Sequence, residues 1–100
     1  AEMALAVEIA PAEADLRYEH GVLLLQAQHV VEGAAELQKA AELDPYYAAP
    51  HWVLGVVHDQ SGMGPEALEH YRAYLSLAAR DDANRARAEA RVAELAAARP

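Results

Sequence analysis

Two runs of helix-forming residues flank one sharp break in residues 48–79, AAPHWVLGVVHDQSGMGPEALEHYRAYLSLAA. The break is Ser61-Gly62-Met63-Gly64-Pro65, where glycines interrupt regular structure and Pro65 suits the first turn of a following helix. Val and Ile do not alternate with polar residues, so strands have little support. The stretch therefore predicts a helical hairpin, with helices over residues 48–61 and 65–79.

The same pattern occurs 34 residues earlier in the chain. With that shift, Gly21 falls on Gly55 and Pro11 falls on Pro45. These matches are specific, because glycine and proline each dictate backbone geometry. The period predicts a first hairpin with helices over residues 13–27 and 31–43, separated by a turn at Gln28–Val31 and ended by Asp44-Pro45.

The two ends of the chain are predicted to be atypical units. Pro11 is expected to end a helix over residues 2–10, as Pro45 ends residues 31–43, which makes residues 2–10 the second helix of a partial unit. A last helix is expected over residues 82–98, N-capped by Asp81 or Asp82. We predict that it is a solubilising cap, with Ala88, Val92 and Leu95 facing inward and with Arg85, Arg87, Arg91 and Glu94 facing water.

The chain resembles the tetratricopeptide repeat family in its 34-residue period and in a glycine within the first helix of each unit. Gly33 departs from the pattern: it stands where the second unit has Ala67, at an expected cost of about 0.5–1 kcal/mol in helix propensity. His20 in place of Leu54 and Ala79 in place of the unit-ending proline are further departures. The residues that carry the resemblance are Tyr18, Gly21, Leu37, Ala40 and Pro45 in the first unit and Trp52, Leu54, Gly55, Ala67, Tyr71 and Tyr74 in the second.

The resemblance implies an all-α fold, a right-handed superhelix of stacked antiparallel helical hairpins with a C-terminal capping helix. It divides a single domain into a partial repeat at residues 1–11, repeats at residues 14–47 and 48–81, and a cap at residues 82–98. It also implies a protein-binding scaffold, with no catalysis and no cofactor.

Composition restricts the partners. The chain has 100 residues and a formal net charge of −8, and the acidic excess lies before Arg72. An acidic body repels a phosphate backbone, so nucleic acid is not expected. No apolar run reaches the roughly 18 residues that span a bilayer, so membrane insertion is not expected either. No signal peptide is visible, which favours the cytoplasm over the periplasm.

No motif in the sequence predicts chemistry. The five histidines, at positions 20, 29, 51, 58 and 70, form neither an HExxH motif nor an i,i+4 pair, so packing or surface roles are favoured over a metal site. Glu66 and Glu69 share a helix, but paired carboxylates on an acidic helical protein usually face solvent. We therefore expect no catalytic residue and no metal ligand. A regulatory or catalytic domain that uses the histidines is the weakest alternative.

By the resemblance, the first helix of each unit lines a concave groove. We expect a partner with an apolar anchor and basic flanks, since Asp15, Glu19 and Asp59 make this region acidic. Tyr18 and Trp52 are equivalent under the 34-residue shift, and their roles as binding anchors or as core residues between repeats stay open. The predicted groove residues are Asp15, Tyr18, Val22 and Leu25 in the first unit and Trp52, Val56, Asp59 and Gln60 in the second.

The N-terminal segment suggests an alternative function, self-association. If residues 1–10 lack the first helix of their own unit, their apolar side chains have one side without a neighbour. A weak homodimer through this edge would make the chain an oligomerisation module of a larger repeat protein. The edge residues are Met3, Ala6, Val7 and Ile9.

Overall fold

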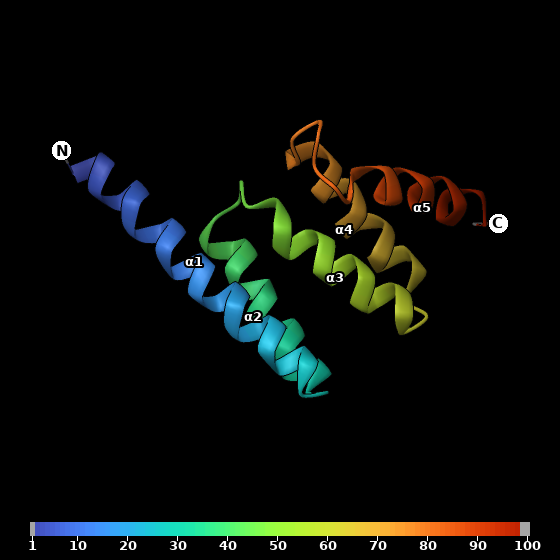
Figure 1. The fold of residues 1–100 in the computed structure, drawn as a ribbon, viewed down its shortest axis with the longest axis horizontal. Helices are drawn as coiled ribbons and strands as arrows, with labels where there is room; N and C mark the ends of the chain where they lie inside the picture. Colours follow the sequence, from blue (N-terminus) through green and yellow to red (C-terminus); the bar gives the residue numbers. More distant parts are fainter. Residues whose placement is uncertain (1, 99–100) are drawn as a thin grey trace.

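A computed structural model describes the backbone of residues 2–98 and the side chains of residues 12–98. The prediction of an all-α fold is confirmed: this part of the chain contains helices and no strand (Figure 1). The predicted helices over residues 31–43, 48–61 and 65–79 are confirmed to within two residues. The elements are α1 (Glu2–Gln26), α2 (Val30–Leu43), α3 (Ala48–Gln60), α4 (Gly64–Leu77) and α5 (Arg85–Ala97).

The helices form two antiparallel hairpins, α1–α2 and α3–α4, followed by α5 (Figure 1). Each helix packs mainly on its neighbours in the sequence, so α2 joins the two hairpins through α3, and α5 lies on α4. The chain consequently forms an elongated body that measures 50 × 31 × 23 Å.

The predicted helix end at Pro11 is wrong. Helix α1 runs unbroken from Glu2 to Gln26 and carries Pro11 in its interior, so residues 2–10 are not a separate helix (Figure 1). Proline fixes φ near the helical value and removes one N–H, and strong helix formers such as Ala10, Ala12 and Glu13 surround it. At Pro45 the outcome is different, because the preceding Asp44 is extended, with φ −135° and ψ 95°.

The first hairpin is joined at a contact between two glycines. A Cβ atom on Gly21 would lie 2.9 Å from Cγ of Leu37 and 3.0 Å from the carbonyl oxygen of Gly33. A Cβ atom on Gly33 would likewise lie 2.9 Å from Cγ of Leu25 and 3.0 Å from the carbonyl oxygen of Gly21. Gly33, which the sequence marked as a departure with a cost in helix propensity, therefore also has a packing role, because it permits the approach of the two backbones.

The second hairpin fills the equivalent place with an aromatic ring. A Cβ atom on Gly55 would lie 2.7 Å from the ring of Tyr71, and Ala67 takes the position of Gly33. Tyr71, Tyr74 and Ala67 are buried together with Ala88 of α5, and the half-buried Trp52 packs against them. This cluster joins α3, α4 and α5.

Helix α5 begins later than predicted. It starts at Arg85 with Asn84 at the N-cap position and no capping side chain. Asp82 instead holds the preceding loop, because its carboxylate accepts hydrogen bonds from the Tyr74 hydroxyl and, at 3.0 Å, from the backbone N–H of Asn84. The Tyr74 bond is the largest cause of a lowered Asp82 pKa.

The inward face of α5 is as predicted and Arg87 is exposed as predicted, but Arg85 and Arg91 have partners within the protein. Ala88 is buried, and Val92 and Leu95 pack on the same core. Arg85 donates to the carbonyl oxygens of Leu75 and Ala78 at 3.0 and 3.1 Å, so it does not simply face water. It satisfies carbonyl groups at the C-terminal end of α4 that lack helical partners.

Candidate binding surface

An apolar hollow of about 370 Å³ lies between the two hairpins. The end of α1, the start of α2 and one side of α3 form its walls. Gln60 and Ser61 add polar groups. The other lining residues are Leu25, Val30, Val53, Val56 and Val57. A mainly apolar wall with a few polar groups is the usual composition of a protein binding pocket.

The α1–α2 turn brings Leu25 and Val30 to this hollow. Gln28 adopts a left-handed conformation with φ 69°, and the N–H of His29 donates to the carbonyl of Leu24 at 2.8 Å. These bonds satisfy the end of α1 and reverse the chain within three residues. Val30 then begins α2, and 45% of its surface stays exposed.

A second hollow, of about 340 Å³, is lined by residues of α1 alone. Val22 lines this hollow and Leu25 lines the first, and residues three apart on a helix share a face. Leu23 is 62% exposed here, and Glu19 contributes an acidic group. The remaining lining residues are Tyr18 and Gln26.

The predicted groove residues separate into three groups. Leu25, Val56 and Gln60 meet in the hollow between the hairpins. Tyr18 and Val22 lie in the second hollow. Asp15, Trp52 and Asp59 line neither hollow, and each has a partner within the protein. The predicted edge residues Met3, Ala6, Val7 and Ile9 lie outside the residues whose side chains are described.

Trp52 belongs to the packing of the second hairpin. Its ring lies 5.6 Å from the rings of both Tyr71 and Tyr74, measured between centroids. Tyr18, its equivalent in the first unit, packs on the ring of Tyr47 at 5.5 Å. The two aromatic residues therefore do not have equivalent surroundings, and Trp52 contributes to the core of its hairpin.

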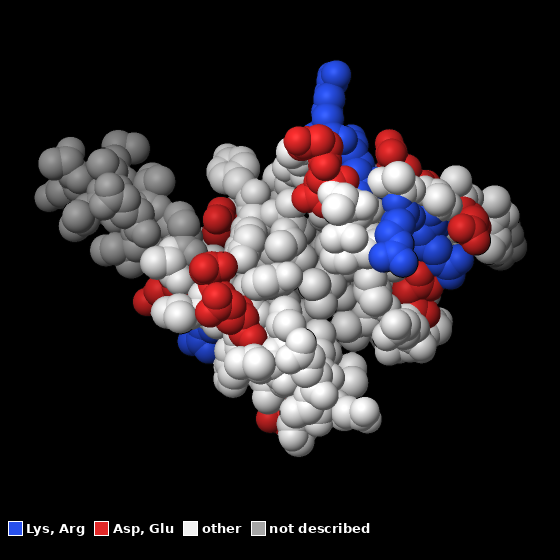
Figure 2. Space-filling model, in the orientation of Figure 1, with Lys and Arg blue, Asp and Glu red and all other residues white. Residues whose placement is uncertain are grey.

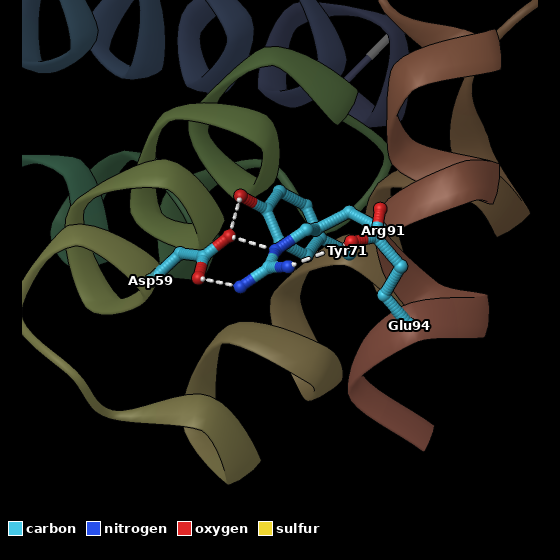
Figure 3. Close-up of polar contacts among 4 residues, drawn as sticks. All are labelled: Asp59, Tyr71, Arg91 and Glu94. Atoms are coloured by element: carbon cyan, nitrogen blue, oxygen red, sulfur yellow. Dashed lines mark hydrogen bonds and ion pairs between the residues drawn. The ribbon is translucent and has the colours of Figure 1, made fainter. Parts of the chain in front are cut away.

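Asp59 is held by Arg91 of α5 (Figure 3). Arg91 Nε and a terminal nitrogen each donate to the carboxylate at 2.7 Å, and the Tyr71 hydroxyl donates to it at 3.0 Å. These bonds, the Arg91 bond foremost, hold the pKa of Asp59 below its usual value. Asp59 is therefore occupied, and the prediction that Arg91 faces water is wrong.

The Asp59–Arg91 pair was missed because the sequence contains no local pattern for it. The two residues are 32 positions apart. One signal was present: in a chain with a 34-residue period, residues about one period apart lie on corresponding helices of neighbouring units. A search for opposite charges at that separation finds this pair.

Asp15 also has a partner, in the loop before α3. The Tyr47 hydroxyl donates to its carboxylate at 2.7 Å, across a shallow hollow that includes Asp44. Burial, followed by the bond to Asp15, raises the pKa of Tyr47. Asp15, Glu19 and Asp59 were predicted to attract a basic partner. Of these three, Glu19 lies on the wall of the 340 Å³ hollow.

Charge is divided between the two ends of the visible face (Figure 2). Mainly acidic side chains lie over α1 and α2, basic and acidic side chains are mixed over α5, and a broad area without charged residues lies between them. A further hollow of about 510 Å³ lies on α4 alone. Glu66, Glu69 and Arg72 make its lining mainly charged, and no second helix forms a wall.

Neither a metal centre nor a membrane span is found in the described part of the chain. No group of three or more His, Cys, Asp or Glu side chains there could hold a metal ion. None of the helices there combines the length and apolar character that crossing a membrane requires.

Comparisons with known proteins give no family. A scan against protein-family models finds no match, and a search of curated proteins finds none either.

Proposed function

We propose that this chain is a non-enzymatic protein-interaction module that binds an apolar segment of another protein in the hollow between its hairpins. The observation that carries this proposal is a hollow of about 370 Å³ with five apolar residues on its walls, contributed by three helices. Such a surface removes an apolar side chain from water, at a gain of about 25 cal/mol per Å² buried.

The partner is a peptide or helix with an apolar anchor and a basic flank. Val30 and Leu23 are large apolar residues that remain substantially exposed beside the hollows. Glu19 supplies a negative charge in the hollow that Leu23 lines, whereas Asp59 is neutralised by Arg91. The basic flank therefore belongs beside α1 and not beside α5.

We further propose that the hairpins stack as a tetratricopeptide-like superhelix. The 34-residue period, the glycines at the helix crossings and the α2–α3 contact between hairpins support this arrangement. In such stacks the hollow between successive units is part of a continuous groove.

A peptide selection with one variant pair tests the binding proposal. Random peptides are selected on the wild-type protein, and their affinities are then measured against Val30→Glu and Val31→Glu. Val30 lines the hollow, whereas its neighbour Val31 is 84% exposed and lines neither hollow. We expect selected peptides with apolar and basic residues, which lose about tenfold in affinity with Val30→Glu only. Equal effects of the two substitutions, or no selectable peptide, would refute the proposal.

Self-association is a second candidate, favoured by two exposed leucines of α1. Leu16 and Leu23 lie seven residues apart on one helix face and are 67% and 62% exposed. If this face joins two copies, Leu16→Glu should lower the sedimentation mass of a concentrated sample, and Ala35→Glu on α2 should leave it unchanged. A wild-type protein that stays monomeric at millimolar concentration excludes this candidate.

A further inference from the structure

Three histidines of the second hairpin lie against one another. His51 and His58 belong to α3, and His70 belongs to α4. The Nδ1 atoms of His51 and His70 are 3.2 Å apart, and the rings of His58 and His70 are stacked with centroids 5.2 Å apart. His70 therefore lies between two imidazoles of the facing helix.

Hydrogen bonding restricts where this cluster can take up protons. His58 Nδ1 must donate to the carbonyl of Leu54, 2.8 Å away, because a carbonyl oxygen only accepts. Between His51 and His70 one Nδ1 donates and the other accepts. The accepting ring therefore has to be neutral, and a proton added to its Nδ1 would place two N–H groups against each other.

Within the part of the chain whose side chains are described, no carboxylate lies within ion-pair distance of the cluster. Among the described residues, the histidine–carboxylate ion pairs are His20 with Glu36 and His29 with Glu32, both in the first hairpin. The charges that act on His70 come from His51 and His58 of α3, and none comes from α2 or α5, the other helices packed on this hairpin. Burial, followed by these two neighbours, lowers the pKa of His70 to about 4, and burial lowers the pKa of His51.

We propose that the His51–His58–His70 cluster makes the α3–α4 hairpin acid-sensitive, so that protonation of the cluster separates the two helices while the α1–α2 hairpin stays closed. The proposal goes beyond peptide binding and needs no bound partner. The inter-hairpin hollow would change with it, because Val53, Val56 and Val57 of its wall belong to α3.

The direction of the effect follows from linkage. Histidine in the unfolded chain has a pKa near 6.5, above that of His70 in the folded protein, so the unfolded chain takes up protons first. The stability of the hairpin is therefore complete above pH 6.5 and falls as the pH is lowered toward 4. Most carboxylates titrate near the lower end of this window. A change in stability between pH 7 and pH 5 is therefore due mainly to histidine.

Unfolding by denaturant at pH 7 and pH 5 tests the proposal, with Trp52 as a fluorescent probe inside the hairpin. From pH 7 to pH 5 the wild-type folding constant should fall about tenfold more than that of His70→Gln. His29→Gln is the matched control, because His29 lies in the first hairpin beside Glu32. It should behave like the wild type.

Amide hydrogen exchange at pH 5 and pH 7 locates the opening. We expect protection, corrected for intrinsic exchange, to fall in α3 and α4 at pH 5 while α1 and α2 keep theirs. Equal pH dependence of the wild type and His70→Gln would overturn the proposal. A uniform loss of protection over both hairpins would overturn the claim that the second opens alone.

Discussion

The two hairpins share a period but close their helix crossings by different means. In α1–α2, two glycines face each other, and the carbonyl oxygen of each is 3.0 Å from the place of a Cβ atom on the other. In α3–α4, one glycine faces the Tyr71 ring, and Ala67 replaces the second glycine. The first crossing is a backbone contact, and the second is an aromatic contact. A repeat can therefore preserve the position of a crossing while its packing changes.

The largest effect is expected from a side chain placed between the backbones of the first hairpin. Gly33→Leu should destabilise the protein by about 3 kcal/mol, because a carbonyl oxygen cannot move aside as a side chain can. The gain in helix propensity, about 1 kcal/mol, offsets only part of the overpacking. Chemical denaturation measures the change. Ala35→Leu, at an exposed position on the same helix, is the control and should be nearly neutral.

Trp52 and Tyr18 are related by the 34-residue shift, but we expect them to contribute unequally to the stability of the protein. Trp52→Ala should cost about 2 kcal/mol, because the ring is half-buried on two tyrosines. Tyr18→Ala should cost about 1 kcal/mol, since Tyr18 packs on one ring at the edge of the molecule. Thermal unfolding of both variants provides the comparison. Equal losses would contradict the assignment of Trp52 to the core.

A double-mutant cycle sharpens the contrast between the crossings. Gly55→Ala should cost about 1 kcal/mol, because its Cβ atom would meet the Tyr71 ring at 2.7 Å. The same substitution should be nearly neutral, or stabilising, in a Tyr71→Leu background, where the ring is absent. In the first hairpin no such second substitution can relieve the clash, because Gly33→Ala would meet a backbone oxygen, that of Gly21. A Gly55→Ala cost that stays the same in both backgrounds would show that the ring is not what restricts this position.

The sequence predicted the parts of the fold that depend on local signals. Asp44-Pro45 and Ser61–Pro65 marked helix ends correctly, because an extended residue or a glycine interrupts the helix there. Pro11 failed as a signal, since strong helix formers on both sides carry α1 through it. Proline disfavours a helix without forbidding one, so the neighbouring residues determine the outcome.

The candidate site was harder to predict, because it depends on contacts between helices. The resemblance to the tetratricopeptide repeat family predicted Leu25, Val56 and Gln60 as groove residues, and these three line one hollow. Helix phase alone could not reveal that Arg91 neutralises Asp59 or that Tyr47 binds Asp15, since both partners come from other elements. A residue's phase on its own helix indicates the direction it faces but not which partner meets it there.

The smallest effect is expected where the first hairpin is tied to the loop before α3. Tyr47→Phe removes the hydroxyl that donates to Asp15 at 2.7 Å but keeps the ring packed on Tyr18. The loss should be about 0.5–1 kcal/mol, the net value of one hydrogen bond near the surface. Tyr46→Phe is a matched control at the adjacent position, because Tyr46 is 83% exposed, and it should cause no measurable change. If the two substitutions had the same effect in denaturant unfolding, the Tyr47–Asp15 bond would not contribute to the packing of the first hairpin against α3.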